Sequence, residues 1–585
     1  MATKSRFLLQ RAVSGLRAHA AWSTSTLSPG RRLWRPQLRH VSWLRELPDV
    51  LSLSLRSHTC GELRSHHLGD KVTLCGWVQY LRQDLFIILR DFSGLTQILI
   101  PQEESARHLK AALCDLTAES VIKVTGTVRR RPVGQENKGM PTGEIEVLAE
   151  DVEVFNVCRQ LPFEIKDFIR KSESLRMQYR YLDLRSSQMQ KNLRLRSKLV
   201  MKMREYLCNV HGFVDVETPT LFKRTPGGAK EFVVPSREPG RFYSLPQSPQ
   251  QFKQLLMVAG IDRYFQIARC YRDEGSKPDR QPEFTQVDME MSFVDQAGIM
   301  SLVEGLLQYA WPAENGSLKV PFQTMTYEEA MRDYGVDKPD TRFSMKLVDI
   351  SEVLLSSEIE FLQSAVSQPG GSIQALNVPR GAVRKETFPV RPLLGSLRLQ
   401  CAQLLESCGI SLRNPSAFHF LWVVDFPLFL PKEDEPGQLE SAHHPFTAPL
   451  PEDKQLLYTE PHKVRGQHFD LILNGCEIGG GSIRIHKASE QLHVLKNILK
   501  EDPSLLSHLL EALDSGAPPH GGIALGLDRL VSIIVRASSI RDVIAFPKSF
   551  RGHDLMSRAP DLVSDEELKS YHISVRWPTE EGEMK

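Results

Sequence analysis

The chain has 585 residues, of which 25% are charged and 41% are hydrophobic, a balance typical of a soluble protein with several domains. Its formal net charge of +2 excludes a uniformly basic nucleic-acid-binding surface, so any contact with RNA has to come from local patches. The nine cysteines are scattered without a Cys-x-x-Cys pair or a cluster at zinc-ligand spacing, which indicates a reducing compartment.

Residues 1–45 differ in composition from the rest of the chain. They contain nine lysines and arginines and many serines, and the first acidic residue is Glu46. An Arg-rich, Ser-rich and acid-poor start is typical of a mitochondrial transit peptide, which predicts a protein of the mitochondrial matrix. A disordered basic tail that contacts RNA is the alternative interpretation of this segment.

Residues 46–158 are predicted to form a small β-barrel. A helix-like segment at residues 105–116 separates the third strand from the fourth, and a turn signal at residues 91–94 separates the second from the third. The five strand-like segments are residues 72–78, 85–90, 96–100, 121–128 and 144–148. Five strands with a helix in this place indicate an OB-fold barrel, a common binder of single-stranded nucleic acids.

A hinge at residues 159–180 leads into a second domain, whose first part is residues 181–342. Residues 193–210 have apolar side chains at helical spacing, and Gly212 follows where this helix is expected to end. Residues 213–219 then read as a strand that stops at its proline.

Residues 264–293 read as two strands joined by a charged loop. The loop contains Arg272, Glu274 and Arg280. Guanidinium groups can bind phosphate through two parallel hydrogen bonds, and a carboxylate can accept hydrogen bonds from a nucleotide. The segment alone is equally consistent with a solvated surface loop.

Within residues 343–412, residues 370–394 show little periodic structure. The second part of the domain, residues 413–585, begins with the most apolar run of the chain, residues 418–430. Asp425 and Pro427 interrupt this run, so it predicts buried strands and no membrane contact.

Residues 470–485 combine two carboxylates, three consecutive glycines and an arginine. Asp470 and Glu477 are candidate Mg²⁺ ligands, because hard cations prefer carboxylate oxygens. The glycines at 479–481 have no Cβ, so a substrate can lie against the backbone. Arg484 presents a guanidinium suited to a carboxylate, although a lone arginine is more often part of a structural salt bridge.

Three segments together resemble the class II aminoacyl-tRNA synthetases. Arg272-Asp273-Glu274 with residues 279–284 resembles motif 2 of that class, and of the aspartyl-tRNA synthetases in particular. The helix, strand and proline of residues 193–219 resemble motif 1, and the glycine-rich segment 521–530 resembles motif 3. The resemblance extends from Gly61 to about Pro578 and favours the bacterial type, which has an insertion between motifs 2 and 3. It implies that residues 343–412 are a shortened form of this insertion. A remnant that cannot close its own core is expected to be partly disordered.

The resemblance implies an α+β multidomain fold, with an N-terminal OB-fold barrel that binds the anticodon and a class II catalytic domain built on an antiparallel sheet with a shortened α/β insertion. It implies an aspartate–tRNA ligase of mitochondrial translation that acts as a homodimer. The enzyme would use ATP and Mg²⁺ to form aspartyl-adenylate from L-aspartate, and would then transfer the aspartyl group to tRNA(Asp).

The resemblance also implies roles for individual residues. The catalytic residues would be Arg272, Glu274 and Arg529. Aspartate would be bound by Ser248, Gln250, Gln251, Phe252, Lys253, Arg272, Gln286, Asp288, His443, His444 and Arg484. ATP would be bound by Arg272, Asp273, Glu274, Arg280, Gln281, Phe284, Glu477, Gly526, Leu527, Asp528 and Arg529. Mg²⁺ would be bound by Asp470 and Glu477, and the anticodon by Phe86, Gln97, Arg129 and Arg131. By pattern alone, Phe86 is better explained as a core aromatic of the barrel.

Two alternatives to an active aspartyl enzyme remain. Asparaginyl- and lysyl-tRNA synthetases share the same plan, but Lys253 and Arg484 would repel a lysine and mispair with an asparagine amide. A non-catalytic tRNA-binding relative is the second alternative, and the complete set of motif residues argues against it. One departure from the family is Gly227, which stands where the loop over the amino acid usually has a glutamate.

Overall fold

The computed structural model describes residues 54–576, except 83–84, 167–169, 226–227, 275–278, 355–358, 360–363, 365–366, 368–371, 379–390, 433–434 and 436. The predicted transit peptide therefore lies outside the described residues, as does Gly227. The chain divides into two compact units, Met1–Val157 and Cys158–Lys585.

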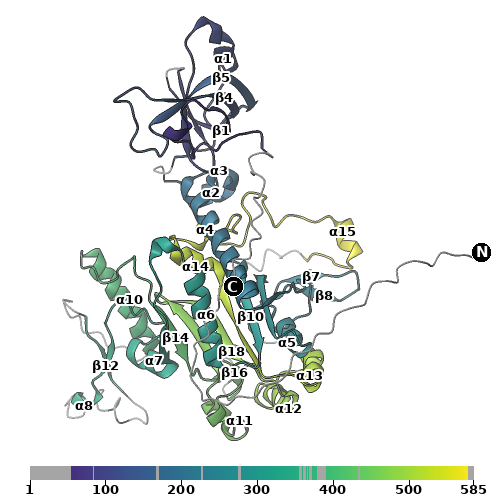
Figure 1. The fold of residues 1–585 in the computed structure, drawn as a ribbon. Coiled ribbons are helices and arrows are strands. Elements are labelled where there is room, and N and C mark those ends of the chain that lie inside the picture. The colour runs from purple at the N-terminus through teal and green to yellow at the C-terminus, as the bar shows by residue number, and fades with distance from the viewer. Residues whose placement is uncertain are drawn as a thin grey trace, which may run out of the picture. The chain divides into compact units, whose positions relative to one another are not determined.

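The first unit is a closed five-stranded barrel with strand order β1-β2-β3-β5-β4, which confirms the predicted OB-fold (Figure 1). Its strands are β1 (Lys71–Arg82), β2 (Phe86–Arg90), β3 (Leu95–Leu99), β4 (Val121–Arg130) and β5 (Ile145–Asn156), and α1 (Arg107–Ala112) lies between β3 and β4. Alternate residues point inward, so Leu74, Ile98 and Val124 belong to a continuous apolar core.

The second unit is built on an eight-stranded sheet with strand order β11-β14-β17-β18-β19-β10-β9-β6. Neighbouring strands are antiparallel, except for the outer pairs β11–β14 and β6–β9. The strands are β6 (Val214–Asp215), β9 (Arg263–Tyr271), β10 (Glu283–Ser292), β11 (Gln323–Thr326), β14 (Phe420–Val424), β17 (His468–Leu473), β18 (Cys476–Ile483) and β19 (His520–Gly526). The two strands predicted around the charged loop are β9 and β10, paired in register.

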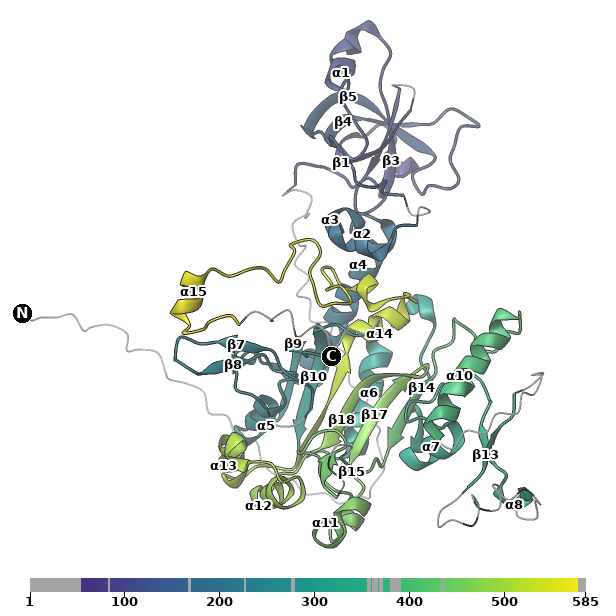
Figure 2. The same cartoon turned by 180° about the vertical axis from the view of Figure 1, so that it is seen from behind.

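The two faces of this sheet have different roles (Figures 1 and 2). The helices α4 (Ser187–Arg204), α6 (Gln296–Ala310) and α14 (Leu527–Ile534) pack against one face and bury the main apolar core with it. Val287 and Met289 of β10 belong to this core. Because side chains alternate along a strand, Gln286, Asp288 and Glu290 are directed to the other face. That face carries the candidate site.

The predicted motif 1 segment differs in its boundaries. Its helix begins at Ser187, six residues before the predicted start, because residues 187–192 contain a single apolar side chain, Met189, which is too few to show an apolar periodicity. A π-helical turn, Glu205–Val210, continues it, and Gly212 with φ +68° ends it as predicted. The predicted strand 213–219 is reduced to the two residues of β6 at the sheet edge.

The second unit has further helices and three small sheets. The helices are α2 (Glu173–Gln178), α3 (Arg180–Asp183), α5 (Gln250–Val258), α7 (Tyr327–Tyr334), α8 (Ser351–Leu354), α10 (Arg391–Ser407), α11 (Leu456–Thr459), α12 (Ala488–His493), α13 (Ser507–Asp514) and α15 (Asp565–Ser570). Two-stranded sheets form from β7 (Val233–Pro235) with β8 (Phe242–Ser244), β12 (Leu347–Asp349) with β13 (Gln374–Leu376), and β15 (Phe429–Pro431) with β16 (Leu439–Ser441). Within the described part of the chain, no helix has the length and apolarity needed to cross a membrane.

The insertion keeps a small core of its own, which differs from the expectation for a shortened remnant. Phe343, Met345, Ala402 and Leu405 form this core, while most of the aperiodic stretch around residues 370–394 lies outside the described residues. Arg398 of α10 fixes its position. Its side chain is 1% exposed, lies 3.8 Å from the ring centre of Phe343 and donates to the carbonyl oxygens of Phe343 and Asp340, both at 2.9 Å. Burial lowers the pKa of Arg398 to about 10.

Candidate active site

A cavity of about 460 Å³ opens on the uncovered face of the sheet. Its floor is formed by β10, β18 and β19, and its walls by α5 and by the loops around residues 272–282 and 442–446. The predicted site residues that line it are Ser248, Gln250, Gln251, Phe252, Lys253, Arg272, Glu274, Arg280, Gln281, Phe284, Gln286, Asp288, His443, His444, Glu477, Arg484, Gly526, Asp528 and Arg529. Of the described residues predicted to bind substrates or metal, Asp273, Asp470 and Leu527 are outside this lining. The structure thus brings together side chains that are up to 281 positions apart, from Ser248 to Arg529.

Lys253 and Arg484 meet across two buried carboxylates. The Lys253 Nζ atom lies 3.2 Å from Asp288 Oδ1 and 3.4 Å from Glu290 Oε2, and Arg484 Nε lies 3.0 Å from Glu290 Oε1. All four side chains are at most 2% exposed. The sequence predicted the two cations as one pocket but did not identify Glu290, which joins them.

Further hydrogen bonds hold the Arg484 guanidinium in a single orientation. Its Nη1 donates to Ser482 Oγ at 2.6 Å and lies 2.7 Å from His444 Nε2, and its Nη2 donates to the carbonyl oxygen of Gly522 at 3.3 Å. Burial and the neighbouring Arg484 keep the pKa of His444 well below its usual value, so this imidazole is neutral.

The two acids in this network respond differently to burial. Burial raises the pKa of Asp288, although Lys253 opposes it. Burial opposes ionisation of Glu290 as well, but the adjacent Arg484 and Lys253 hold the pKa of Glu290 below its usual value. Glu290 is therefore ionised and compensates the positive charge of Lys253 and Arg484.

The other end of the cavity is lined by arginines. The Arg272 guanidinium lies 5.1 Å from the ring centre of Phe284, and its buried Nε has no hydrogen-bond partner among the described residues. Arg529 donates from Nη1 to the carbonyl oxygen of Glu477 at 2.6 Å and lies 3.4 Å from Asp279. Unused donors on positively charged side chains suit an anionic ligand.

The charged loop between β9 and β10 is held by ion pairs at its surface. Arg280 pairs with Glu274, and Asp273 pairs with Lys230 at 3.3 Å. Both pairs are partly exposed, so a ligand can exchange with them at little cost.

Three predicted ligand-binding side chains have their polar atoms committed to the fold. Gln251 donates to Thr225 Oγ1 at 2.9 Å and accepts from His508 Nε2. Gln281 donates to the carbonyl oxygens of Lys548 and Arg280 and accepts from the backbone N–H of Lys548. Asp528 accepts from Arg196 Nη1 at 2.5 Å and from the backbone of Thr285 at 2.9 Å. These residues shape the cavity wall in the structure, and most of their partners are remote in sequence.

Asp470 and Glu477 converge above Gly480. A Cβ placed on Gly480 would be 2.8 Å from Asp470 Oδ1 and 3.7 Å from Glu477 Oε1, so only glycine leaves the space between these carboxylates open. Burial and the Glu477 carboxylate raise the pKa of Asp470 well above its usual range. Its buried Oδ2 has no partner among the described residues. These observations fit a divalent cation, which would relieve the repulsion between the two carboxylates.

Lys338 supplies the positive charge at this pair of carboxylates in the structure. Its Nζ lies 2.7 Å from Glu477 Oε2, and Lys338 comes from the loop that precedes the insertion. Arg342 holds that loop by a bidentate pair with Asp340, at 2.9 and 2.7 Å. A Cβ on Gly475, in the β17–β18 turn, would be 2.9 Å from Asp340 Cβ, so the loop and the turn are tightly packed.

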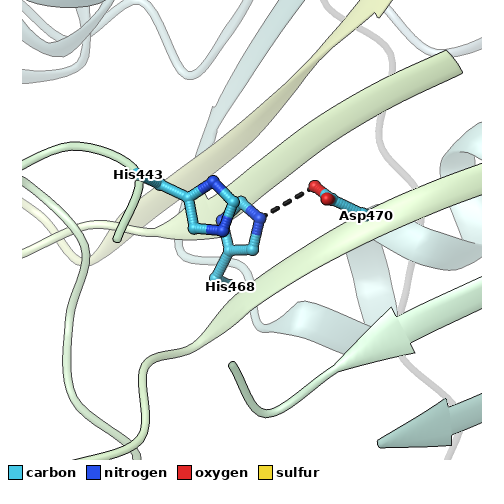
Figure 3. A group of neighbouring side chains, drawn as sticks. All are labelled: His443, His468 and Asp470. Carbon is cyan, nitrogen blue, oxygen red and sulfur yellow. Dashed lines mark hydrogen bonds and ion pairs between the residues drawn. The ribbon is translucent and has the colours of Figure 1, made fainter. Parts of the chain in front are cut away.

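His468 and His443 lie beside Asp470 (Figure 3). His468 Nε2 is 2.8 Å from Asp470 Oδ1, and the His443 ring stacks on the His468 ring with centroids 3.2 Å apart and an interplanar angle of 16°. Burial lowers the pKa of His468 to about 3, so it is neutral at neutral pH.

Sequence reasoning missed Glu290, His468, Ser482 and Lys338. Glu290 and His468 carried a usable signal, because each is two positions from a predicted site residue on a strand and therefore shares its face. Ser482 carried the same signal relative to Arg484. Lys338 carried none, because its partner Glu477 lies far along the chain.

On the barrel, Gln97 and Arg129 share one carboxylate. Gln97 Nε2 and Arg129 Nε each lie 2.8 Å from an oxygen of Glu146, which is 2% exposed. Phe86 is half-buried and does not belong to the apolar core formed by the described barrel residues, which argues against the core alternative. Arg131 is 6% exposed and donates from Nε to the carbonyl oxygen of Ile145 at 3.0 Å, so its burial does not support the predicted RNA contact.

Comparisons with known proteins match both units of the chain. The family model described as tRNA synthetases class II (D, K and N) matches residues 172–550, and the one described as OB-fold nucleic acid binding domain matches residues 72–155. The chain is 61% identical over 603 residues to the mitochondrial aspartate–tRNA ligase of Rattus norvegicus, covering 92% of each chain. It is 60% identical over 600 residues to that of Homo sapiens, covering 92% of this chain and 93% of the human protein. Both alignments are longer than this chain of 585 residues, so both relatives contain residues without a counterpart here.

The fold resembles that of solved class II synthetases. Asparaginyl-tRNA synthetase from Pyrococcus horikoshii complexed with asparaginyl-adenylate has a TM-score of 0.58 at 20% identity, covering 85% of this chain and 99% of that chain. A putative aspartyl-tRNA synthetase from Leishmania major Friedlin has a TM-score of 0.57 at 19% identity, covering 83% and 92%. At these identities the likeness concerns the fold alone.

Proposed function

The chain belongs to the class II tRNA synthetases, in their mitochondrial aspartate–tRNA ligase branch, and we propose that the cavity on its sheet joins L-aspartate to tRNA(Asp) in two steps with ATP. In the first step, the α-carboxylate of aspartate attacks the α-phosphorus of ATP, and pyrophosphate leaves. In the second step, a terminal ribose hydroxyl of the tRNA attacks the aspartyl carbonyl, and AMP leaves.

The observation that carries this proposal is the buried pair of Lys253 and Arg484 at one end of the cavity. Glu290 lies between them and fixes their positions. The side-chain carboxylate of aspartate would take the place of His444 on Arg484 and bind Lys253 through its remaining N–H. Both partners are donors only, so an asparagine amide would place donor against donor and a lysine would meet two like charges.

The rest of the amino acid would be held by the walls around this pocket. Ser248, Gln250 and Phe252 of the α5 segment would orient aspartate, and Gln286 and Asp288 of β10 would bind its ammonium group. Burial raises the pKa of Asp288, and an ammonium beside its unpartnered oxygen Oδ2 would restore the ionised form. His443 lies at the rim of the same pocket.

Arg272 would stabilise the transition state of the first step. Arg272 lines the same cavity as Lys253 and Arg529, and its buried Nε has no partner among the described residues, so this donor is available to the α-phosphate. Charge grows on the phosphate oxygens during the attack, and a fixed guanidinium lowers the energy of that state. Arg529 and Arg280 would bind the outer phosphates, Phe284 would stack on the adenine, and Glu274 would position the adenine or the tRNA end.

Asp470 and Glu477 would hold Mg²⁺. The open space above Gly480 and the unpartnered Asp470 oxygen favour this assignment. Bound there, Mg²⁺ would neutralise phosphate oxygens of ATP.

The barrel would bind the anticodon through Phe86, Gln97 and Arg129. Register pairs place Phe86 opposite Leu99, and Gln97 and Leu99 alternate with the core residue Ile98. Phe86 and Gln97 are therefore directed to the outer face of the neighbouring strands β2 and β3. Arg129, which follows the core residue Val128 on β4, binds the same Glu146 carboxylate as Gln97. An aromatic ring and two polar groups suit unpaired bases.

We propose that the enzyme is a homodimer joined at the edge strand β6 and helix α4. The described side chains at this edge include exposed Met201, Val210 and Val214. An unpaired strand edge and exposed apolar side chains are stabilised when a second copy covers them. Met201→Glu should convert the dimer to monomers, measured by analytical ultracentrifugation. A monomeric parent protein would refute the assignment.

We propose the domain boundaries that the sequence predicted. The match at residues 72–155 supports an anticodon-binding domain at 46–158, and the match at 172–550 supports a catalytic domain divided between residues 181–342 and 413–585. The relatives are mitochondrial, and residues 1–45 would direct this chain to the matrix. Import into isolated mitochondria, with and without residues 1–45, tests this point.

Amino-acid-dependent exchange between ATP and pyrophosphate tests the catalytic proposal. The chain without residues 1–45 should catalyse exchange with aspartate and not with asparagine or lysine. Exchange with either of the other amino acids would refute the roles given to Lys253 and Arg484. A folded protein without exchange would instead support the non-catalytic alternative.

A further inference from the structure

His443, His468 and Asp470 form a compact group of metal-binding donors at the edge of the cavity (Figure 3). One donor atom from each residue lies within 4.8 Å of the other two. His468 and Asp470 are two positions apart on β17 and so share one face of the sheet. His443 belongs to the loop that lines the cavity, and its ring stacks on that of His468.

Two buried atoms of this group have no partner among the described residues, namely His468 Nδ1 and Asp470 Oδ2. His468 uses its other nitrogen, Nε2, in the bond to Asp470. A cation shared by His468 and Asp470 would take the place of this hydrogen bond, with His468 Nε2 and an Asp470 oxygen as ligands. Buried polar atoms without partners are uncommon, and Asp470 Oδ2 would gain a partner by binding the cation.

The donor set selects the class of cation. Two imidazole nitrogens and one carboxylate are the ligands that Zn²⁺ and similar cations prefer, whereas Mg²⁺ prefers oxygen ligands throughout. Three protein ligands leave at least one position for water or another ligand. Ligand atoms about 2 Å from a tetrahedral ion lie about 3.3 Å apart. Side-chain rotations that move the three ligand atoms by about an ångström would therefore complete the site.

We propose that His443, His468 and Asp470 bind Zn²⁺ or a cation of similar preference, such as Co²⁺. The site shares Asp470 with the carboxylate pair assigned to Mg²⁺ and includes a histidine from the amino-acid pocket. Binding there therefore inhibits adenylate formation, and this second half of the inference rests on the proposed function.

Cobalt absorption spectroscopy on the full chain, without nucleotide, tests the binding. Co²⁺ should bind with one equivalent per chain and give visible bands of four- or five-coordinate geometry, also in excess Mg²⁺. His468→Gln and His443→Gln should each weaken binding about tenfold or more. Exposed His462 and Cys476 provide controls, so His462→Gln and Cys476→Ser should bind as the parent does.

Circular dichroism would show whether each variant is folded, and His443→Gln changes an exposed side chain that the core does not require. The inference is overturned if Co²⁺ gives no such bands, or if its affinity is unchanged in both folded histidine variants. It is also overturned if Cys476→Ser abolishes the bands, because the ligand would then be a thiolate.

Inhibition is measured separately as the Zn²⁺ concentration that halves aspartate-dependent exchange. The proposed function fails if exchange is absent while Co²⁺ still binds at the histidines. The inference fails alone if exchange proceeds and Zn²⁺ binds without affecting it.

Discussion

Replacing Lys338 with methionine should tighten the binding of divalent cations to the nucleotide-free protein. Lys338 Nζ lies 2.7 Å from Glu477 Oε2, so a cation that binds Glu477 has to displace the ammonium. Methionine keeps the aliphatic length of the side chain and removes the charge. A variant that gains affinity cannot be explained by damage to the fold.

The size of the effect follows from the exposure of this pair. The Lys338 and Glu477 side chains are 38% and 33% exposed, so water screens them and the pair is worth about 1 kcal/mol. Removing a competitor of that strength should lower the dissociation constant for the cation about fivefold. Lys338 also opposes the raised pKa of Asp470, so its loss leaves the two carboxylates with more uncompensated negative charge.

Electron paramagnetic resonance of Mn²⁺, used in place of Mg²⁺, measures this affinity without turnover. Lys346→Met is a matched control, because Lys346 belongs to the same part of the chain and pairs with Asp333 at 2.9 Å. The control should bind Mn²⁺ as the parent does. Unchanged or weaker Mn²⁺ binding by folded Lys338→Met would refute the reasoning.

Three further predictions concern the site and its buried groups. Glu290→Gln leaves Arg484 with an uncompensated buried charge, so the free energy of unfolding should fall by about 3–5 kcal/mol in thermal unfolding. An unchanged melting temperature would contradict the buried network. Gly480→Ala places a methyl group 2.8 Å from Asp470 Oδ1, so Mn²⁺ binding should be lost while circular dichroism stays the same, and retained binding would place the cation elsewhere. The pKa of His468 is about 3 in the fold and 6.5 in the unfolded chain, so its contribution to stability is complete above pH 6.5 and is lost as pH falls towards 3. Urea unfolding should accordingly show a stability that falls by up to about 1.4 kcal/mol per pH unit from this histidine, and by less in His468→Gln.

The parts of the fold that the sequence predicted are those with a strong local pattern. The barrel strands and the β9–β10 pair have alternating apolar residues, and their existence follows from that alternation. The first turns of α4 have no such pattern, because Met189 is the one apolar residue among residues 187–192 and a single apolar residue does not define a periodicity. For β6 the sequence predicted too long a strand. Residues 213–219 have a strand-like composition, but at the sheet edge only Val214 and Asp215 pair with a neighbouring strand.

Site residues that belong to sequence motifs could be predicted. The hydrogen-bond and ion-pair partners of these residues could not, where the partners come from remote segments. Motifs located Arg272, Arg484 and Arg529 in one cavity. They did not show that Gln281 is bound by the backbone of Lys548, 267 positions away, or that Lys338 reaches Glu477. Local sequence patterns indicate which face a side chain shares, whereas the partner across that face depends on the assembled sheet.

The buried guanidinium of Arg398 has a consequence for how much the insertion can vary. It binds the carbonyl oxygens of Asp340 and Phe343, while Asp340 packs on the β17–β18 turn. Arg398 thus ties α10 to the loop 340–343, which itself packs on the sheet, and the chain between Met345 and α10 can change in length without breaking these contacts. Shorter and longer versions of this segment would then preserve the same spacing between Lys338 and Glu477.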